Sequence, residues 1–214
     1  LRLDRQPRHI ECFDNSNLQG AHPVASCVVF RDGKPARKEY RHFNIKTVEG
    51  PDDYASMREV VFRRYSRLQE EGAELPDLII ADGGKGQMGI IHEVLEYLGL
   101  DIPVAGLAKN DRHRTSELLC GYPPVLVGIR PTSPLFHFLA HIQEEVHRFA
   151  VSFHRQKRSK AFIHSELEQI EGIGDKTIRT LLQHFRSVAK VKAAPAEELS
   201  ALVGPAKAKK IRAF

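Results

Sequence analysis

The most informative stretch of the chain is Leu78-Ile79-Ile80-Ala81-Asp82-Gly83-Gly84-Lys85-Gly86-Gln87, in which a compact apolar run meets a glycine-rich turn. An apolar run between Pro76 and Gly83 is typical of a strand buried in a sheet. Behind the glycines, apolar residues recur at helical spacing up to Leu98, and residues 103–107 form another apolar run. A strand, a helix and a second strand in this order predict a β-α-β unit with parallel strands.

Antiparallel strands are predicted on the N-terminal side of this unit. Residues 9–13 and 24–30 are apolar runs, and an Asp-Gly turn at 32–33 leads into extended residues at 38–44. These features predict three antiparallel strands that include a β-hairpin. An amphipathic helix is expected to follow over residues 53–71.

The sequence after residue 118 predicts a change from an α/β to an all-α architecture. Two weak strands at 118–120 and 125–129 precede a helix that starts near Ser133. Residues 154–160 are basic and poor in apolar side chains, and two similar glycine turns about 30 residues apart follow in a helical region. We expect an α/β domain with a mixed sheet at residues 1–154, a linker at 155–161 and a small all-α domain at 162–214.

Composition restricts the class of protein. Hydrophobic residues make up 42% and charged residues 28% of the 214 residues, as in soluble globular proteins, and no apolar run is long enough to cross a membrane. The three cysteines form no C-x-x-C pair, so they indicate neither a disulfide framework nor a zinc site. Because the chain begins at Leu1 and has no signal peptide, we expect a cytoplasmic fragment of a longer protein.

Basic charge is concentrated near the C-terminus. The formal net charge is +5, and residues 154–214 carry 13 Lys and Arg against 6 Asp and Glu. The rest of the chain is slightly acidic. This distribution predicts that the C-terminal part binds a polyanion, although a solvated basic face would give the same composition.

Two aspartates follow predicted strands and are candidates for a metal site. Asp14 ends the first strand and Asp82 ends the fourth. Side chains at strand ends beside loops commonly form the site of an α/β sheet. Two carboxylates at one place are costly unless a cation joins them, and oxygen ligands suit Mg²⁺ or Mn²⁺. An aspartate after a strand is also a common turn residue, so both interpretations stay open here.

Histidines on the helix after Ser133 offer further candidates. His147 lies opposite the apolar stripe and could act as a base or a metal ligand, or be an exposed helical histidine. His137 and His141 have the i, i+4 spacing of some zinc sites, but no third ligand is evident, so we assign them a structural role.

Phosphate contacts are predicted in both parts of the chain. The turn after Asp82 lacks the G-x-x-x-x-G-K-[ST] pattern, so a nucleoside triphosphate site is not expected. In the C-terminal part, Gly172-Ile173-Gly174 and Val203-Gly204-Pro205 place glycines between helices, where main-chain amides can approach a phosphate. Such contacts would be independent of base sequence and sensitive to salt. Packing turns between helices are the alternative.

Several motifs together resemble those of the UvrC family. They are Ile10-Glu11-Cys12-Phe13-Asp14-Asn15-Ser16, Asp52-Asp53-Tyr54, the stretch from Ile80 to Gln87, Ala108-Lys109 with Asp111-Arg112, and Glu145-Val146-His147-Arg148-Phe149-Ala150. The glycine turns resemble the tandem helix-hairpin-helix module of that family. The resemblance covers nearly the whole chain in the right order, and the D-G-G-K-G-Q and E-x-H-R-F-A strings are specific together.

The resemblance implies a ribonuclease-H-like endonuclease domain whose metal-binding triad corresponds to Asp14, Asp82 and His147, with Asp53 as a further acidic position. It implies bound Mg²⁺ or Mn²⁺ and an incision 5′ to a lesion in DNA, made in bacterial nucleotide excision repair after the partner UvrB has been loaded. An N-terminal half with the 3′ nuclease, and cysteine-rich and UvrB-contacting regions, are expected upstream of this chain.

The resemblance and the charge pattern also give candidate DNA contacts: Lys85, Lys109, Arg112 and Arg148 in the first domain, and Gly172, Ile173, Gly174, Lys176, Gly204 and Lys207 in the second. The second turn, Val203-Gly204-Pro205, departs from the usual pair of glycines around an apolar residue. We therefore expect weaker DNA contact there than at the first turn.

Two other functions are weighed against this one. A non-catalytic DNA-binding scaffold could have the same fold with an idle acidic cluster, but the presence of Asp14, Asp82 and His147 argues against it. A ribonuclease H that cleaves RNA would read 2′-hydroxyls. Enzymes of that class generally lack tandem hairpins and typically carry a carboxylate where this chain has His147.

Overall fold

The computed structural model describes residues 3, 5–16, 24–48, 50–109 and 115–213. The chain divides into two compact units, Leu1–Phe153 and His154–Phe214. Within the described ranges, none of the helices combines the length and the apolar character that crossing a lipid bilayer requires.

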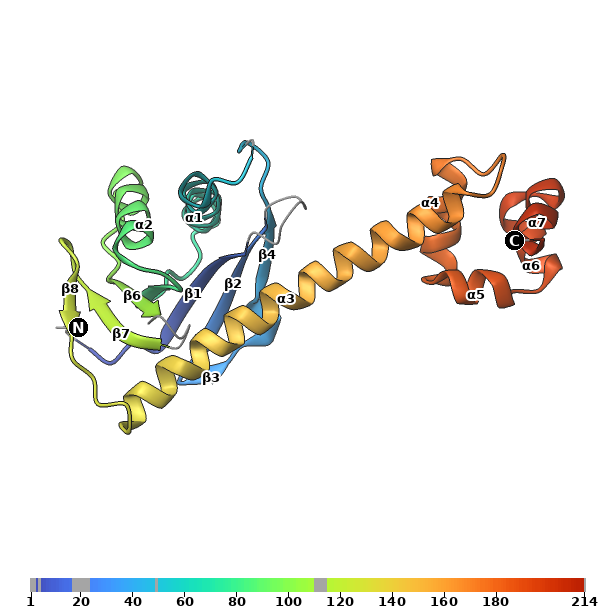
Figure 1. The fold of residues 1–214 in the computed structure, drawn as a ribbon. Coiled ribbons are helices and arrows are strands. Elements are labelled where there is room, and N and C mark those ends of the chain that lie inside the picture. Colours follow the sequence, from blue (N-terminus) through green and yellow to red (C-terminus); the bar gives the residue numbers. More distant parts are fainter. Residues whose placement is uncertain (1–2, 4, 17–23, 49, 110–114, 214) are drawn as a thin grey trace. The chain divides into compact units, whose positions relative to one another are not determined.

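The first unit is built on one mixed sheet (Figure 1). Its strands run in the order β3-β2-β1-β5-β6-β7-β8, and β4 also pairs with β2. The central strands β1, β5 and β6 are parallel, and the pairings toward both edges are antiparallel. The expected mixed α/β sheet is thereby confirmed. The strands are β1 (His9–Ser16), β2 (Val24–Arg31), β3 (Lys34–Pro35), β4 (Arg41–Asn44), β5 (Leu78–Ala81), β6 (Val104–Lys109), β7 (Thr115–Cys120) and β8 (Val125–Val127).

The Asp-Gly turn between β2 and β3 forms as predicted. Asp32 and Gly33 both have positive φ, 48° and 76°, and they connect the paired residues Arg31 and Lys34. Positive φ at both central residues is the geometry that matches the twist of a two-residue hairpin.

The predicted strand at 38–44 is only partly correct. Residues 37–39 form a 3-10 helix, and β4 begins at Arg41. Tyr40, between them, is buried, and its hydroxyl donates a hydrogen bond of 3.0 Å to Glu145. Tyr40 itself has an extended backbone, so the departure from the predicted strand lies in the 3-10 helix before it.

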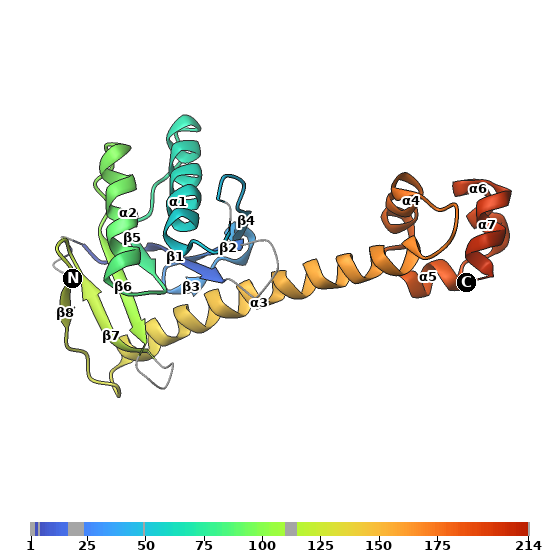
Figure 2. The same ribbon diagram turned by 45° about the horizontal axis from the view of Figure 1, so that its top comes forward.

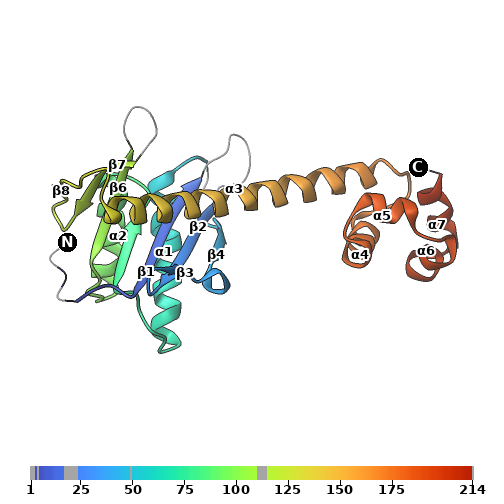
Figure 3. The ribbon, with the colours of Figure 1, turned by 90° about the horizontal axis from the view of Figure 1, so that it is seen from below.

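Helices cover both faces of the sheet. α1 (Asp53–Glu70) and α2 (Lys85–Tyr97) lie side by side on one face, and the first part of α3 (Pro134–Glu168) crosses the other (Figures 2 and 3). α1 starts at the expected place because the Asp52 side chain accepts a hydrogen bond of 2.9 Å from the Ala55 amide.

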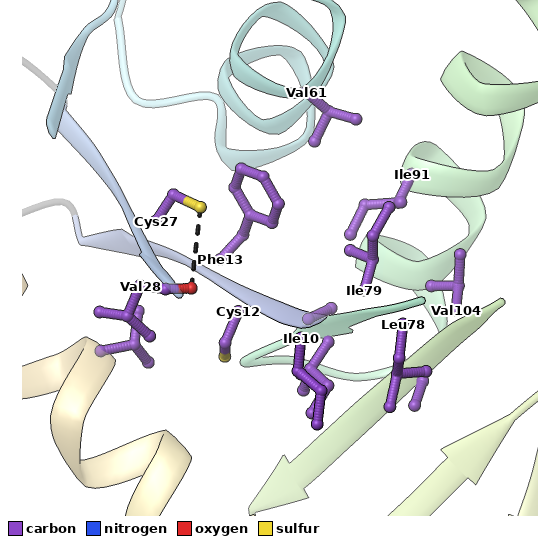
Figure 4. Close-up of a cluster of buried hydrophobic side chains, with 14 of the residues drawn as sticks. Ile10, Cys12, Phe13, Cys27, Val28, Val61, Leu78, Ile79, Ile91 and Val104 are labelled. Carbon is purple, nitrogen blue, oxygen red and sulfur yellow. Dashed lines mark hydrogen bonds between the residues drawn. The ribbon is translucent and has the colours of Figure 1, made fainter. Parts of the chain in front are cut away.

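The core of this unit lies on both sides of β1 and β2 (Figure 4). Phe13 and Cys27 face α1, whereas their neighbours Cys12 and Val28 face α3. All four side chains are fully buried. The alternation is what a strand with helices on both faces requires, and it explains why these strands are apolar without interruption.

The second unit is helical, as expected. The end of α3 is followed by α4 (Asp175–Phe185), α5 (Val188–Ala193), α6 (Ala196–Val203) and α7 (Pro205–Arg212). Its separate core includes the buried side chains of Leu167, Ile178, Leu181, Val191, Leu199 and Ile211.

Residues 155–161, expected as a linker between domains, are helical and belong to α3. The sequence of α3 after Pro134 contains neither glycine nor proline. Lys, Arg and Gln are good helix formers, so a basic and apolar-poor composition does not end a helix.

Candidate functional site

Asp14, on β1, and Asp82, directly after β5, lie side by side at the same level of the sheet. β1 and β5 are parallel, Phe13 is paired with Ala81, and the Asp82 amide donates a hydrogen bond of 2.8 Å to the Phe13 carbonyl. Both aspartates are nearly buried, with 7% and 6% of their surface exposed. The expectation that Asp14 ends its strand is wrong by two residues, because pairing with β2 extends β1 to Ser16.

Helix α3 brings two polar side chains to these aspartates. The Gln143 amide donates a hydrogen bond to Oδ1 of Asp82, and Nδ1 of His147 lies 3.8 Å from Oδ2 of Asp14. Gln143 and His147 are four residues apart and therefore share one face of the helix. The His147 side chain is 61% exposed, as its position opposite the apolar stripe predicts.

Sequence reasoning missed Gln143. The residue is 6% exposed and lies beside the buried Ile142 and Val146. The available signal was a polar residue one helical turn before His147 at the edge of the apolar stripe, which by itself is common on helices.

The donor chemistry at this place fits a divalent cation. Two nearly buried carboxylates on neighbouring strands repel each other, and their desolvation is costly without a positive charge. Carboxylate oxygens are ligands that suit Mg²⁺ and Mn²⁺, and the imidazole of His147 lies next to them. In the described part of the chain, however, no three His, Cys, Asp or Glu side chains are close enough together to count as a preformed metal cluster.

Asp53 is connected to the site through the main chain. It is the first residue of α1, and its carbonyl accepts a hydrogen bond of 2.7 Å from the Asn15 side chain, next to Asp14. Its own side chain is exposed and borders an open cleft formed by residues 51–54 and 84–87. Asp53 is thus connected to the neighbour of Asp14 through its carbonyl oxygen.

Of the four candidate DNA contacts in the first unit, the structure describes the side chains of Lys85 and Arg148. Lys85 is exposed at the start of α2 and lines the same cleft. Arg148 is exposed but donates two hydrogen bonds to Glu145, of 2.6 and 3.0 Å, which lower the pKa of that carboxyl. Lys109 ends β6, and its side chain lies outside the described structure. Arg112 lies outside the described residues.

The first glycine turn of the second unit has the geometry of a helix-to-helix hairpin. Gly172 has a φ of +82°, which a side chain would strain, and Gly174 precedes α4. Ile173 between them is buried in the unit's core, whereas Lys176 is exposed on the first turn of α4. At this turn the apolar Ile173 is therefore buried in the core, whereas the two glycines and Lys176 are exposed to solvent.

The helix after the second glycine turn contacts the region of the first glycine turn. Gly204, with a φ of +87°, separates α6 from α7. On α7, the Lys207 ammonium donates a hydrogen bond of 2.9 Å to the Thr177 hydroxyl, and Lys210 donates one of 2.9 Å to the Glu171 carbonyl. Lys207, expected to contact DNA beside its own turn, is therefore located against the first turn.

Residues 1–151, the larger part of the chain, match the family described as the UvrC RNAse H endonuclease domain. The chain belongs to the UvrC family. Residues 165–214 match a second description, a SAM-like helix-hairpin-helix tandem. The resemblance drawn from the sequence motifs is confirmed for both parts.

UvrC relatives are similar over nearly the whole of this chain. UvrABC system protein C of Bacteroides fragilis is 59% identical over 212 residues, which cover 99% of this chain and 35% of that protein. The protein of the same name from Streptococcus uberis is 55% identical over 208 residues, covering 97% and 35%. The chain thus spans about a third of the length of these UvrC relatives.

Two solved structures show distant similarity to this UvrC chain. Human endonuclease V has a TM-score of 0.36 at 12% identity, covering 72% of this chain and 86% of that one. Endonuclease V of Ciona intestinalis, in complex with inosine-containing DNA, has a TM-score of 0.38 at 16% identity, covering 49% and 47%. Such low scores support no statement about function.

Proposed function

We propose that this chain is the part of a UvrC nuclease that cuts a DNA strand 5′ to a lesion during bacterial nucleotide excision repair. The observation that carries the proposal is that Asp14 and Asp82 lie side by side where β1 pairs with β5, and that Nδ1 of His147 lies 3.8 Å from Oδ2 of Asp14. Two nearly buried carboxylates at neighbouring positions favour the binding of a cation, which is the arrangement expected of a site for phosphodiester hydrolysis.

Asp14, Asp82 and His147 are the proposed holders of Mg²⁺ or Mn²⁺, which when bound neutralises charge on the scissile phosphate and lowers the pKa of the attacking water. Gln143 fixes the rotation of the Asp82 carboxylate through its hydrogen bond to Oδ1. His147 is open to solvent and can accept or return a proton near Asp14. Asp53 supplies a further negative charge at the adjoining cleft.

The second unit is proposed to hold the DNA without reading its sequence. Gly172, Gly174 and Gly204 leave main-chain amides accessible to phosphates, and Ile173 anchors the first turn in the core. Lys176, Lys207 and Lys210 add positive charge to that turn. In the first unit, phosphate contacts are proposed for Lys85, Lys109, Arg112 and Arg148.

The proposed partners follow from UvrC membership. The substrate is duplex or bubble DNA that contains a lesion and on which UvrB has been loaded. The 3′ incision is assigned to an N-terminal half that is not in this chain, which spans 35% of the length of its relatives.

The direct test is nicking of a lesion-containing duplex preloaded with UvrB, with the N-terminal half supplied separately. We expect a nick 5′ to the lesion that requires Mg²⁺ or Mn²⁺. A chain that binds this DNA but never cuts it, in either metal, would be the scaffold and not the nuclease. Cutting of RNA in preference to DNA would support the ribonuclease H alternative.

His147→Ala is expected to remove cutting and to leave both DNA affinity and folding unchanged. The side chain is 61% exposed, so its loss should change the free energy of unfolding by no more than about 0.5 kcal/mol. Nicking, DNA binding by fluorescence anisotropy and urea unfolding are compared for the variant and the parent chain. Loss of stability would instead assign His147 to packing.

Lys176→Glu is expected to weaken DNA binding and to reduce the slope of log K against log salt concentration by about 1, because one phosphate contact is lost. Anisotropy titrations at several salt concentrations measure the slope. Lys190→Glu makes the same change of charge on α5 and is the control. Equal effects of the two substitutions would mean that net charge alone, not the first turn, determines binding.

A further inference from the structure

An open cleft adjoins the candidate catalytic aspartates and has no assigned occupant. It has a volume of about 630 Å³ and is formed by residues 51–54, at the start of α1, and 84–87, at the start of α2. Residues 84–87 follow Asp82 closely in the sequence, and the Asp53 carbonyl is bonded to Asn15, the neighbour of Asp14. A nucleotide beside a scissile phosphate at the aspartates would therefore have this cleft within reach.

Tyr54 presents an aromatic ring at the cleft. Its surface is 53% exposed, although large apolar rings gain free energy when they are buried. The ring edge packs directly against Gly86: a Cβ atom at that position would lie 2.4 Å from the Tyr54 hydroxyl oxygen and 2.8 Å from Cε1. Gly86 thus allows one edge of the Tyr54 ring to lie against the start of α2, while the rest of the ring is exposed to solvent.

Charge favours an uncharged occupant. Among the described residues, the charged groups that border the cleft are the carboxylates of Asp52 and Asp53 and the ammonium group of Lys85. A phosphate would be repelled by the two carboxylates, whereas a nucleobase is neutral and has a π-face that stacks on tyrosine.

We propose that this cleft is a nucleobase subsite, in which Tyr54 stacks on the base of a nucleotide that flanks the scissile phosphate. Lys85, at the rim, pairs with a phosphate of the same strand. The inference rests on the proposed nuclease function and adds to it a contact with the base. Stacking accepts every base, so the subsite positions the strand without selecting a sequence.

Fluorescence gives a test that does not depend on cutting. The chain has no tryptophan, so Tyr54→Trp introduces a single indole at the cleft. In an Asp14→Asn background, which keeps the DNA intact, we expect bubble DNA to quench this emission over the same concentration range in which anisotropy reports binding. Tyr97→Trp, at an 80% exposed position at the end of α2, is the control and should not be quenched. Binding without quenching at position 54 would overturn the subsite.

Nicking separates failure of this inference from failure of the nuclease proposal. Tyr54→Ala is expected to raise KM about tenfold with little change in kcat, and Tyr54→Phe to keep the parent KM. A single abasic nucleotide moved along the strand should abolish the difference between parent and Tyr54→Ala at one position only. If Tyr54→Ala raises KM by the same factor on every abasic substrate, Tyr54 has only a structural role. No nicking by the parent chain would remove the proposed function and this inference with it.

Discussion

Asp82→Asn is expected to lower the rate of 5′ nicking on the order of a hundredfold to a thousandfold, the size of effect seen when a group that stabilises charge in the transition state is removed. Asparagine keeps the shape of the side chain and can still accept a hydrogen bond from Gln143. The charge needed to hold a divalent ion is lost. Nicking rates are measured with Mg²⁺ and with Mn²⁺ at saturating DNA.

The same variant has a readout that does not involve cutting. Metal that binds only the folded protein raises Tm, so Mg²⁺ or Mn²⁺ should stabilise the parent chain more than Asp82→Asn. Without metal, the variant should unfold at the same temperature or higher, because the repulsion between Asp14 and Asp82 is relieved. Asp101→Asn, at an exposed position, is the matched control. Undiminished nicking by Asp82→Asn would exclude this place as the active site.

Arg64→Met is expected to lower the free energy of unfolding by about 3–5 kcal/mol, because it leaves the Glu11 carboxylate buried without its partner. Glu11 is fully buried on β1, where it accepts hydrogen bonds from Arg64 and, at 2.9 Å, from the Tyr65 hydroxyl. Arg58→Met breaks an ion pair with Glu93 in which both side chains are about half exposed, and it should cost less than about 1 kcal/mol. Urea unfolding measures both, and equal losses would contradict the prediction.

Acid should weaken the same interaction in the parent chain. Burial raises the pKa of Glu11, but the hydrogen bonds from Arg64 and His9 outweigh it and lower the pKa from 4.5 to about 2. A carboxyl whose pKa is lowered on folding stabilises the protein fully above its unfolded value, and this stability is lost as the pH falls through the folded value. The difference in stability between parent and Arg64→Met should therefore shrink between pH 4.5 and pH 2.

Much of the fold could be predicted because it depends on local signals. The apolar run before Asp82, the glycines after it and the helical spacing up to Leu98 are sufficient for a β-α-β unit. Strand pairing then places the two aspartates side by side, since residues at the same level of adjacent parallel strands are neighbours. The exposure of His147 also follows from the helical period.

Other predictions were incomplete because they depend on partners far apart in the sequence. Tyr40, near the start of a predicted strand, is buried with its hydroxyl bonded to Glu145, and Glu11 is a charged residue inside an apolar strand because Arg64 pairs with it. The helical state of the predicted linker at 155–161 was also not evident from its basic composition, since composition alone does not end a helix.

The sequence by itself determined the mixed sheet with its β-α-β unit, the family and the neighbouring positions of the two candidate aspartates. Only the tertiary structure decided that Gln143 bonds to Asp82, that Lys207 lies against Thr177 and that Tyr54 borders a cleft beside Gly86. The physical reason is that periodicity fixes which face of an element a residue occupies, whereas the side chain it meets depends on how elements distant in the chain are packed together.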